Sequence, residues 1–185
     1  MEARRLSMVF YIIVLLFSST AIAADFKEYW AAQAHYGIAF PADWRYKSEN
    51  NNMIATTSSG LASINVTVAP YSSQNSRKIR SVSDEPNMMQ RFIYTVKKAV
   101  NADVLQTGKT VLSNNDAVWV KYIFVQKSLD MELWFVAYSA IAIRNDNMYT
   151  VTARAAGQSK REALAMFDKT WPIFKISIVS LFIDP

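Results

Sequence analysis

Cysteine is missing from this sequence, and both glycine and histidine are rare. None of the 185 residues is cysteine, four are glycine, and the single histidine stands at position 35. A chain without cysteine forms no disulfide and no thiolate metal site, and it has no thiol nucleophile. The glycines, at positions 37, 60, 108 and 157, match neither a phosphate-binding loop nor the G-x-S-x-G turn of a hydrolase.

The single histidine limits acid–base chemistry further. A Ser-His-Asp triad would need His35, and no motif accompanies this residue. Because His35 also lacks a cluster of partner groups, we interpret it as structural. Asp130 and Glu132 fit the solvated end of a hairpin better than an acid–base pair. We therefore predict no enzyme activity, no cofactor and no metal site.

The charge of the chain is only mildly basic. Its formal net charge is +5, from 20 lysines and arginines and 15 acidic residues. No aromatic-rich RNA-binding pattern accompanies this charge, so we predict no nucleic-acid partner. The charge supports at most a weak contact with an anionic membrane surface.

The first 23 residues have the pattern of a secretory signal peptide. Arg4 and Arg5 precede the apolar run Met8–Phe17, and Ala21-Ile22-Ala23 forms an A-x-A cleavage signal. We predict cleavage near Ala23/Ala24 and an exported protein, periplasmic or secreted, in which residues 24–185 form one domain. An uncleaved anchor is the alternative, although the span up to Ala24 is 17 residues, and a membrane-spanning helix needs roughly 20.

Periodicity predicts strands in the first half of the mature chain and a helix after them. In the segment 62–68, small or aliphatic residues alternate with polar ones, which is typical of a half-buried strand. Shorter strands are predicted at 36–40, 44–47 and 53–57. A helix should begin after Asp84 as its N-cap, with Glu85 and Pro86 in its first turn. Its apolar stripe comprises Met89, Phe92, Ile93, Val96 and Val100.

Four further strands are predicted as an antiparallel meander, at 104–113, 117–126, 131–143 and 148–156. Segments 114–116, 128–130 and 145–147 separate them, and their Asn and Asp residues favour tight turns. These turns carry too few oxygens for calcium, which takes six to eight. The third strand is apolar on both faces and should lie inside the sheet.

A helix closes the chain. Ser159 and Glu162 form a capping box at its start, and Leu164, Phe167 and Trp171 form its buried stripe. Pro172 should end or kink this helix. For 174–183 the pattern fits either a continued helix or an edge strand.

The order of these elements resembles the PsbP-like family, which shares its fold with the Mog-type Ran-binding proteins. The resemblance is carried by Gly-Ile-Ala-Phe-Pro-Ala-Asp-Trp at 37–44, by the strand at 64–71 and by the closing helix. It implies an α+β fold, an α/β/α sandwich around an antiparallel sheet, and a role in binding or assembly rather than catalysis. No residue motif here matches the metal or membrane-protein contacts of photosystem-associated members, so those are not carried over.

Two groups of residues are candidates for partner binding. Arg77, Lys78 and Arg80 are the densest basic group, and they lie in a polar loop. Trp119 and Trp134 point away from the likelier core face of their strands, so they can face a partner or a second core layer. We predict a non-catalytic module that contacts an envelope protein. The alternative is a carrier that holds a small apolar ligand between sheet and helix, beside one of these tryptophans.

Overall fold

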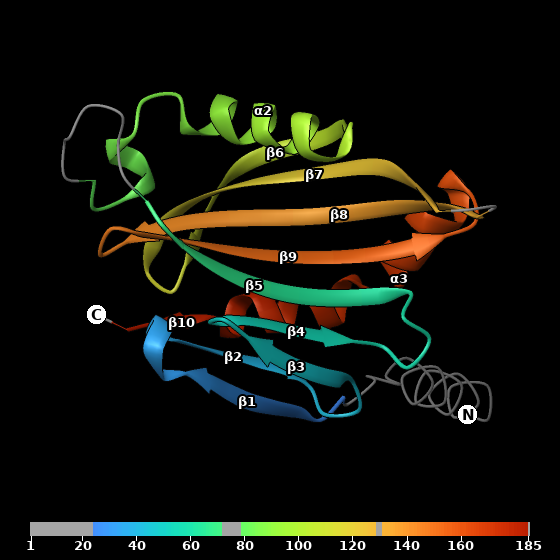
Figure 1. The fold of residues 1–185 in the computed structure, drawn as a ribbon, viewed down its shortest axis with the longest axis horizontal. Helices are drawn as coiled ribbons and strands as arrows, with labels where there is room; N and C mark the ends of the chain where they lie inside the picture. Colours follow the sequence, from blue (N-terminus) through green and yellow to red (C-terminus); the bar gives the residue numbers. More distant parts are fainter. Residues whose placement is uncertain (1–23, 72–78, 129–130, 185) are drawn as a thin grey trace, which may run out of the picture.

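The computed structural model describes residues 24–71, 79–128 and 131–184, which form two antiparallel sheets and two α-helices (Figure 1). Its class is α+β. The elements are, in chain order, β1 (Phe26–Ala31), η1 (Ala32–Ala34), β2 (Tyr36–Pro41), β3 (Arg45–Glu49), β4 (Asn52–Thr56), β5 (Ala62–Pro70), η2 (Val82–Asp84), α2 (Met88–Val100), β6 (Asp103–Leu112), β7 (Asn115–Ser128), β8 (Met131–Arg144), β9 (Asn147–Gly157), α3 (Lys160–Ser180) and β10 (Phe182–Ile183).

The large sheet contains the predicted meander. Its strand order is β3-β4-β5-β9-β8-β7-β6, and all of its pairings are antiparallel. β8, which is apolar on both faces, lies between β9 and β7, as predicted. A small sheet of order β1-β2-β10 lies beside it and contains both the first and the last strand.

Two-residue turns set the register of the meander. Ser113 and Asn114 join β6 to β7, and Asn145 and Asp146 join β8 to β9; all four have φ between 48° and 60°. Left-handed angles at both central residues match the right-handed twist of the flanking strands. The turns predicted at 114–116 and 145–147 are therefore confirmed as two-residue turns. The first begins one residue earlier than predicted, at Ser113, and ends at Asn114 because Asn115 and Asp116 belong to β7, and the second is shorter because Asn147 belongs to β9.

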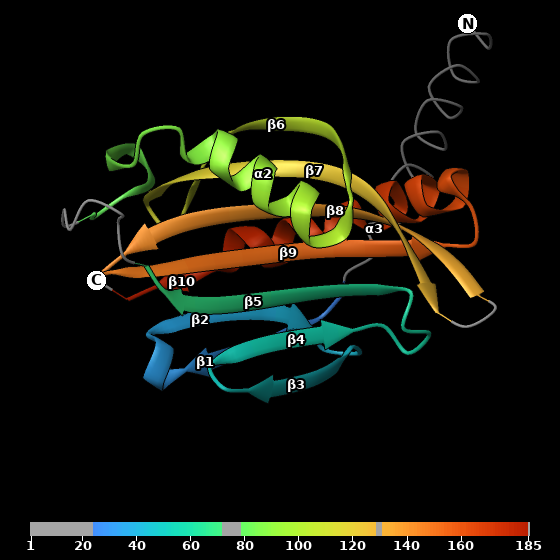
Figure 2. The same cartoon turned by 45° about the horizontal axis from the view of Figure 1, so that its top comes forward.

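Both faces of the large sheet are covered, which makes the molecule an α/β/α sandwich (Figure 2). In β7, Val118, Val120, Tyr122 and Phe124 pack on the side of α2, while Ala117 and Ile123 pack on the side of α3. Side chains that alternate along a strand point to opposite faces. A strand that packs on both sides, such as β8, is therefore apolar on both faces.

The start of α2 corrects the sequence analysis. The carboxylate of Asp84 accepts hydrogen bonds from the backbone N–H groups of Arg80 and Ser81, and this closes a capping box on the short helix η2. Asp84 is thus committed to the preceding turn. α2 begins at Met88, after Asn87 at φ 59° with no side-chain cap. The predicted stripe is confirmed, with Val96 buried and its other members partly buried.

α3 is longer than predicted. Ser159 Oγ accepts from the Glu162 N–H at 3.2 Å, and the Glu162 carboxylate accepts from the N–H of Gln158 rather than that of Ser159. Pro172 lies inside the helix and does not end it. The ambiguous tail resolves into both alternatives in succession, since the helix runs to Ser180 and β10 follows.

Every glycine within a strand faces a tryptophan on the neighbouring strand. Gly37 pairs with Trp30, Gly108 with Trp119, and Gly157 with Trp134. A Cβ atom at position 37 would lie 2.7 Å from the Trp30 ring, and one at position 108 would lie 2.8 Å from the Trp119 ring. These two glycines leave the space in which the indole rings lie.

Candidate functional site

The described residues contain no cluster of side chains that fits a metal ion. No group of three or more His, Asp or Glu side chains among them is arranged to hold a metal ion. His35 has a left-handed backbone at the end of η1, its side chain is 68% exposed, and its Nδ1 lies 3.8 Å from Asp184. No helix in this part of the chain has the length and apolar character needed to cross a bilayer.

The structure describes only one of the three predicted basic residues. Arg77 and Lys78 lie outside the described residues, as does Asp130. Arg80 is exposed, and it lies beside a hollow whose lining also includes Asn115 and Arg144. Contact of this loop with a partner stays a prediction.

Trp119 and Trp134 lie on the α3 side of the sheet, where both are partly buried against the main core. Trp119 stacks on Tyr138, with ring centroids 5.2 Å apart, and Tyr138 in turn contacts Trp171 of α3 at 5.1 Å. Burial raises the pKa of Tyr138 to about 12. These contacts belong to the second core layer that the sequence analysis left open, and a role in partner binding stays a prediction.

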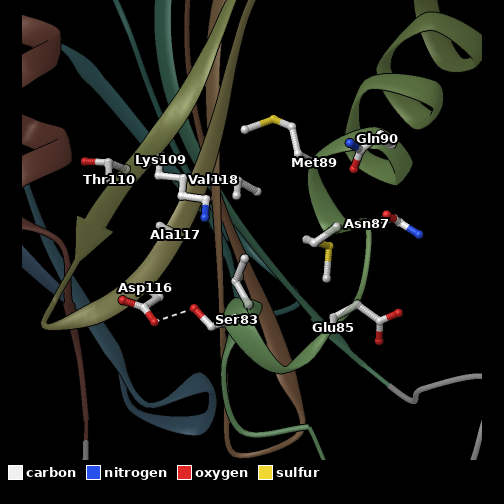
Figure 3. Close-up of a pocket in the computed structure, with 12 residues that line it drawn as sticks. Ser83, Glu85, Asn87, Met89, Gln90, Lys109, Thr110, Asp116, Ala117 and Val118 are labelled. Carbon is white, nitrogen blue, oxygen red and sulfur yellow. Dashed lines mark hydrogen bonds between the residues drawn. The ribbon is translucent and has the colours of Figure 1, made fainter.

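A cleft of about 510 Å³ opens on the opposite face, between the start of α2 and strands β6 and β7 (Figure 3). Its apolar lining residues are Val82, Met88, Met89, Ala117 and Val118. Val82, Met88 and Val118 are buried, and Met89 is partly exposed. Methionine is flexible and polarisable, so this lining can adapt to ligands of different shapes.

Polar groups mark the edges of this cleft. At one end, Ser83 Oγ donates to the Asp116 carboxylate at 2.5 Å (Figure 3). At another, Glu85 pairs with Arg91, whose Nη1 also donates to Tyr71 Oη at 3.3 Å. Burial and the nearby Glu85 raise the pKa of Tyr71, although Arg91 opposes the shift. Lys109 of β6 reaches the same cleft.

An exposed apolar patch lies around the end of α3 and the small sheet. We define this patch by Trp30, Ile176, Val179 and Phe182, which are 52%, 50%, 76% and 50% exposed. The rings of Trp30 and Phe182 are 6.0 Å apart, and both residues line one hollow with Ser180. Ile176 and Val179 are three residues apart on α3, so they lie on the same side of the helix.

Sequence reasoning missed both this patch and the cleft. The apolar residues of the patch come from β1, α3 and β10, and their proximity depends on how the small sheet pairs. One signal was present, because Ile176 and Val179 fall outside the buried stripe of Leu164, Phe167 and Trp171.

The fold and these surfaces define a small α+β sandwich domain with a cleft between helix and sheet. The chain belongs to the PsbP family, whose model matches residues 24–176. The solution structure of cyanobacterial PsbP (CyanoP) from Synechocystis sp. PCC 6803 is similar at 12% identity and a TM-score of 0.60, over 91% of this chain and 99% of that one.

A second solved structure is similar over almost its whole length. The Pseudomonas aeruginosa protein PA94, described as a protein of unknown function and putative regulator, matches at 15% identity and a TM-score of 0.51, over 86% of this chain and 98% of its own. No curated protein matches the sequence. These structural likenesses establish the fold.

Proposed function

We propose that the chain is an exported, non-catalytic binding module that docks a protein partner through the apolar patch. The family match begins at residue 24, directly after the predicted signal peptide. The observation that carries the proposal is the exposure of Trp30 and Phe182, whose rings are 6.0 Å apart, together with that of Ile176 and Val179 on the end of α3 that leads into β10. Large apolar side chains that gather on a surface are typical of interaction sites, whereas scattered ones are not.

The patch suits a protein better than a membrane. Glu28 lies two residues before Trp30, on the same face of β1, and it is exposed, so a negative charge flanks the patch. An anionic bilayer would select a basic rim. β1 is also an edge strand, since it pairs only with β2 among the described strands. Its free backbone groups can bind an extended segment of the partner next to the apolar side chains.

Photo-crosslinking tests this proposal. A benzophenone amino acid at position 179 should give a discrete adduct in envelope extract, because Val179 is the most exposed of the four patch residues, at 76%. The matched control carries the same group at Tyr94, which is 66% exposed on α2. The partner identified in the adduct, once purified, should then bind the wild-type protein saturably. The double variant Trp30→Ser, Phe182→Ser should weaken that binding at least tenfold.

Three outcomes would oppose the proposal. Equal adducts at positions 179 and 94 would indicate unspecific contact. An unchanged affinity in the Trp30 and Phe182 variant would place the contact elsewhere. A dimer mass for the purified protein by light scattering, lost in Val179→Asp, would show that a second copy of the chain covers the patch.

The cleft beside α2 favours a second function, that of a small-ligand carrier. It combines apolar Met88 and Met89 with polar groups at its edges, as ligand sites do. Native mass spectrometry of freshly purified protein should then show a bound mass. Met89→Lys should remove that mass, and Tyr94→Lys on the exposed face of α2 should keep it. A protein without adducts that binds none of a panel of fatty acids and lipids would contradict the carrier function.

A further inference from the structure

A second hollow, of about 530 Å³, lies where two hairpins of the large sheet end. Its lining residues are Ile79, Arg80, Asn115, Arg144, Asn145 and Asp146. They come from the β6–β7 hairpin, the β8–β9 hairpin and the segment that precedes η2. Two of the six are arginines, which supply positively charged hydrogen-bond donors, two are asparagines with neutral amides, and one is the acidic Asp146.

The guanidinium of Arg144 is held in place by a buried amide. Asn115 is 9% exposed, and its Nδ2 donates to the carbonyl oxygens of Leu112 and Ser113 at 3.3 and 2.8 Å. These two bonds orient the amide so that its Oδ1 accepts from Arg144 Nη1 at 3.1 Å. The donor is therefore oriented without any ligand, which lowers the entropic cost of binding.

The positive charge at this hollow is not balanced by a contact. Among the described residues, neither Arg80 nor Arg144 forms an ion pair within 4.0 Å, although the carboxylate of Asp146 lines the same hollow. Arg144 Nε is buried and, within the described chain, donates to no acceptor. A buried charged donor that lacks a partner is costly, and an anion beside it would lower that cost.

We propose that this hollow is an oxyanion-binding site in which Arg144 and Arg80 hold a phosphate or carboxylate group. The planar guanidinium donates parallel N–H groups to such anions. Asn145 supplies a further amide donor at the rim. The hollow is larger than the anionic group alone, so it has room for the rest of a small solute or for a lipid headgroup. It shares no lining residue with the cleft beside α2 or with the apolar patch, and the proposal does not depend on either.

Arginine Nε–Hε signals in ¹H–¹⁵N spectra report this binding directly. Inorganic phosphate and acetate are added in turn at constant ionic strength. The signal of Arg144 should shift saturably, and calorimetry should give a matching Kd. Arg80→Gln should weaken binding about tenfold, and Arg144→Gln should abolish it. Arg161→Gln, at an exposed arginine of α3, is the matched control and should leave the Kd unchanged.

Binding to lipid vesicles distinguishes the two possible sources of the anion, a lipid headgroup and a free solute. A lipid headgroup is identified if the protein co-sediments with phosphatidylglycerol vesicles but not with phosphatidylcholine vesicles, and if Arg80→Gln reduces this co-sedimentation. Saturable binding of phosphate or acetate without such co-sedimentation would identify a free solute. The proposal is overturned if no probe shifts the Arg144 signal saturably, or if Arg80→Gln and Arg161→Gln weaken binding equally. Because Arg80 is exposed, its substitution tests the site without disturbing the Asn115 contact.

Discussion

At the scale of single residues, Gly108 of the large sheet is determined by its tryptophan neighbour. Gly108 leaves room for the Trp119 indole, which in turn stacks on Tyr138. The sequence alone shows a glycine in a strand, which is usually a weakness. Only the register, which pairs Gly108 with Trp119, explains why a larger residue does not fit there.

Gly108→Ala should therefore destabilise the protein. The added Cβ would lie 2.8 Å from the Trp119 ring, so either the ring or the strand must move, at about 1 to 3 kcal/mol for overpacking. Urea denaturation measures the loss. In a Trp119→Leu background the same substitution should cost much less, and an equal cost in both backgrounds would show that the indole is not the cause.

Buried tyrosines predict how stability depends on pH. Burial raises the pKa of Tyr138 to about 12, and the pKa of Tyr36, Tyr122 and Tyr149 is raised as well. A raised pKa in the folded state means that unfolding releases a proton above about pH 10, the value for an exposed tyrosine. The contribution to stability is thus complete below pH 10 and is lost between pH 10 and 12.

For Tyr138 alone this loss is about 2 to 3 kcal/mol. Chemical denaturation between pH 8 and 12 should show the free energy of unfolding falling in the upper half of that range. Tyr138→Phe should reduce the fall, and Tyr94→Phe, at a tyrosine that is 66% exposed, should not. A Tyr138→Phe profile parallel to that of the wild type would refute this assignment.

At the scale of elements, turns and helix caps that depend on one or two residues were predictable from the sequence. The choice of a capping residue between two adjacent helices was not. The turns at Asn145–Asp146 and the cap at Ser159 follow from residue type alone, and both are present. Asp84 carries the same kind of signal, but its carboxylate caps η2 instead of α2. Nothing local distinguishes the two helices that it can serve. Pro172 lies mid-helix because the packing of Phe174 and Ile178 in the main core stabilises the turns that follow.

The cap of α3 can be tested by a matched pair of variants. Ser159→Ala removes the acceptor for the Glu162 N–H and should cost about 1 kcal/mol. Ser159→Asp keeps an acceptor at the N-terminal end of the helix dipole and should retain the stability. Denaturation midpoints compare the two. Equal losses would mean that the hydrogen bond is not responsible for the effect.

At the scale of the whole molecule, the apolar β8 and β7 join two cores into one unit. Val136 and Ala140 pack on the α3 side, and Ala137 packs on the α2 side of the same strand. The class, the meander and the two-sided covering were predictable because the strand pattern repeats along the chain. The small sheet was not, since β10 pairs with β2 across almost the entire sequence. The apolar patch depends on that distant pairing, and the cleft depends on how α2 packs on β6 and β7.

Because β7 and β8 belong to both cores, we expect the two cores to unfold cooperatively. Phe167 is 1% exposed in the α3 core, and Phe167→Ala should cost about 3 to 5 kcal/mol. Hydrogen exchange in residues 24–185 should then accelerate in α2 as well as in α3, because both helices pack on β8. Tyr94→Ala, on the exposed side of α2, is the control and should change neither. Faster exchange confined to α3 would show that the two layers unfold separately.

The tryptophans that pair with glycines can also serve as intrinsic fluorescence probes. Of the five tryptophans, three report on different strand pairs: Trp30 on β1–β2, Trp119 on β6–β7 and Trp134 on β8–β9. In a variant that retains one of these three as its single tryptophan, the fluorescence would come from one known strand pair. Tryptophan fluorescence recorded during refolding of these variants can then give the order in which the three strand pairs form, without an added dye.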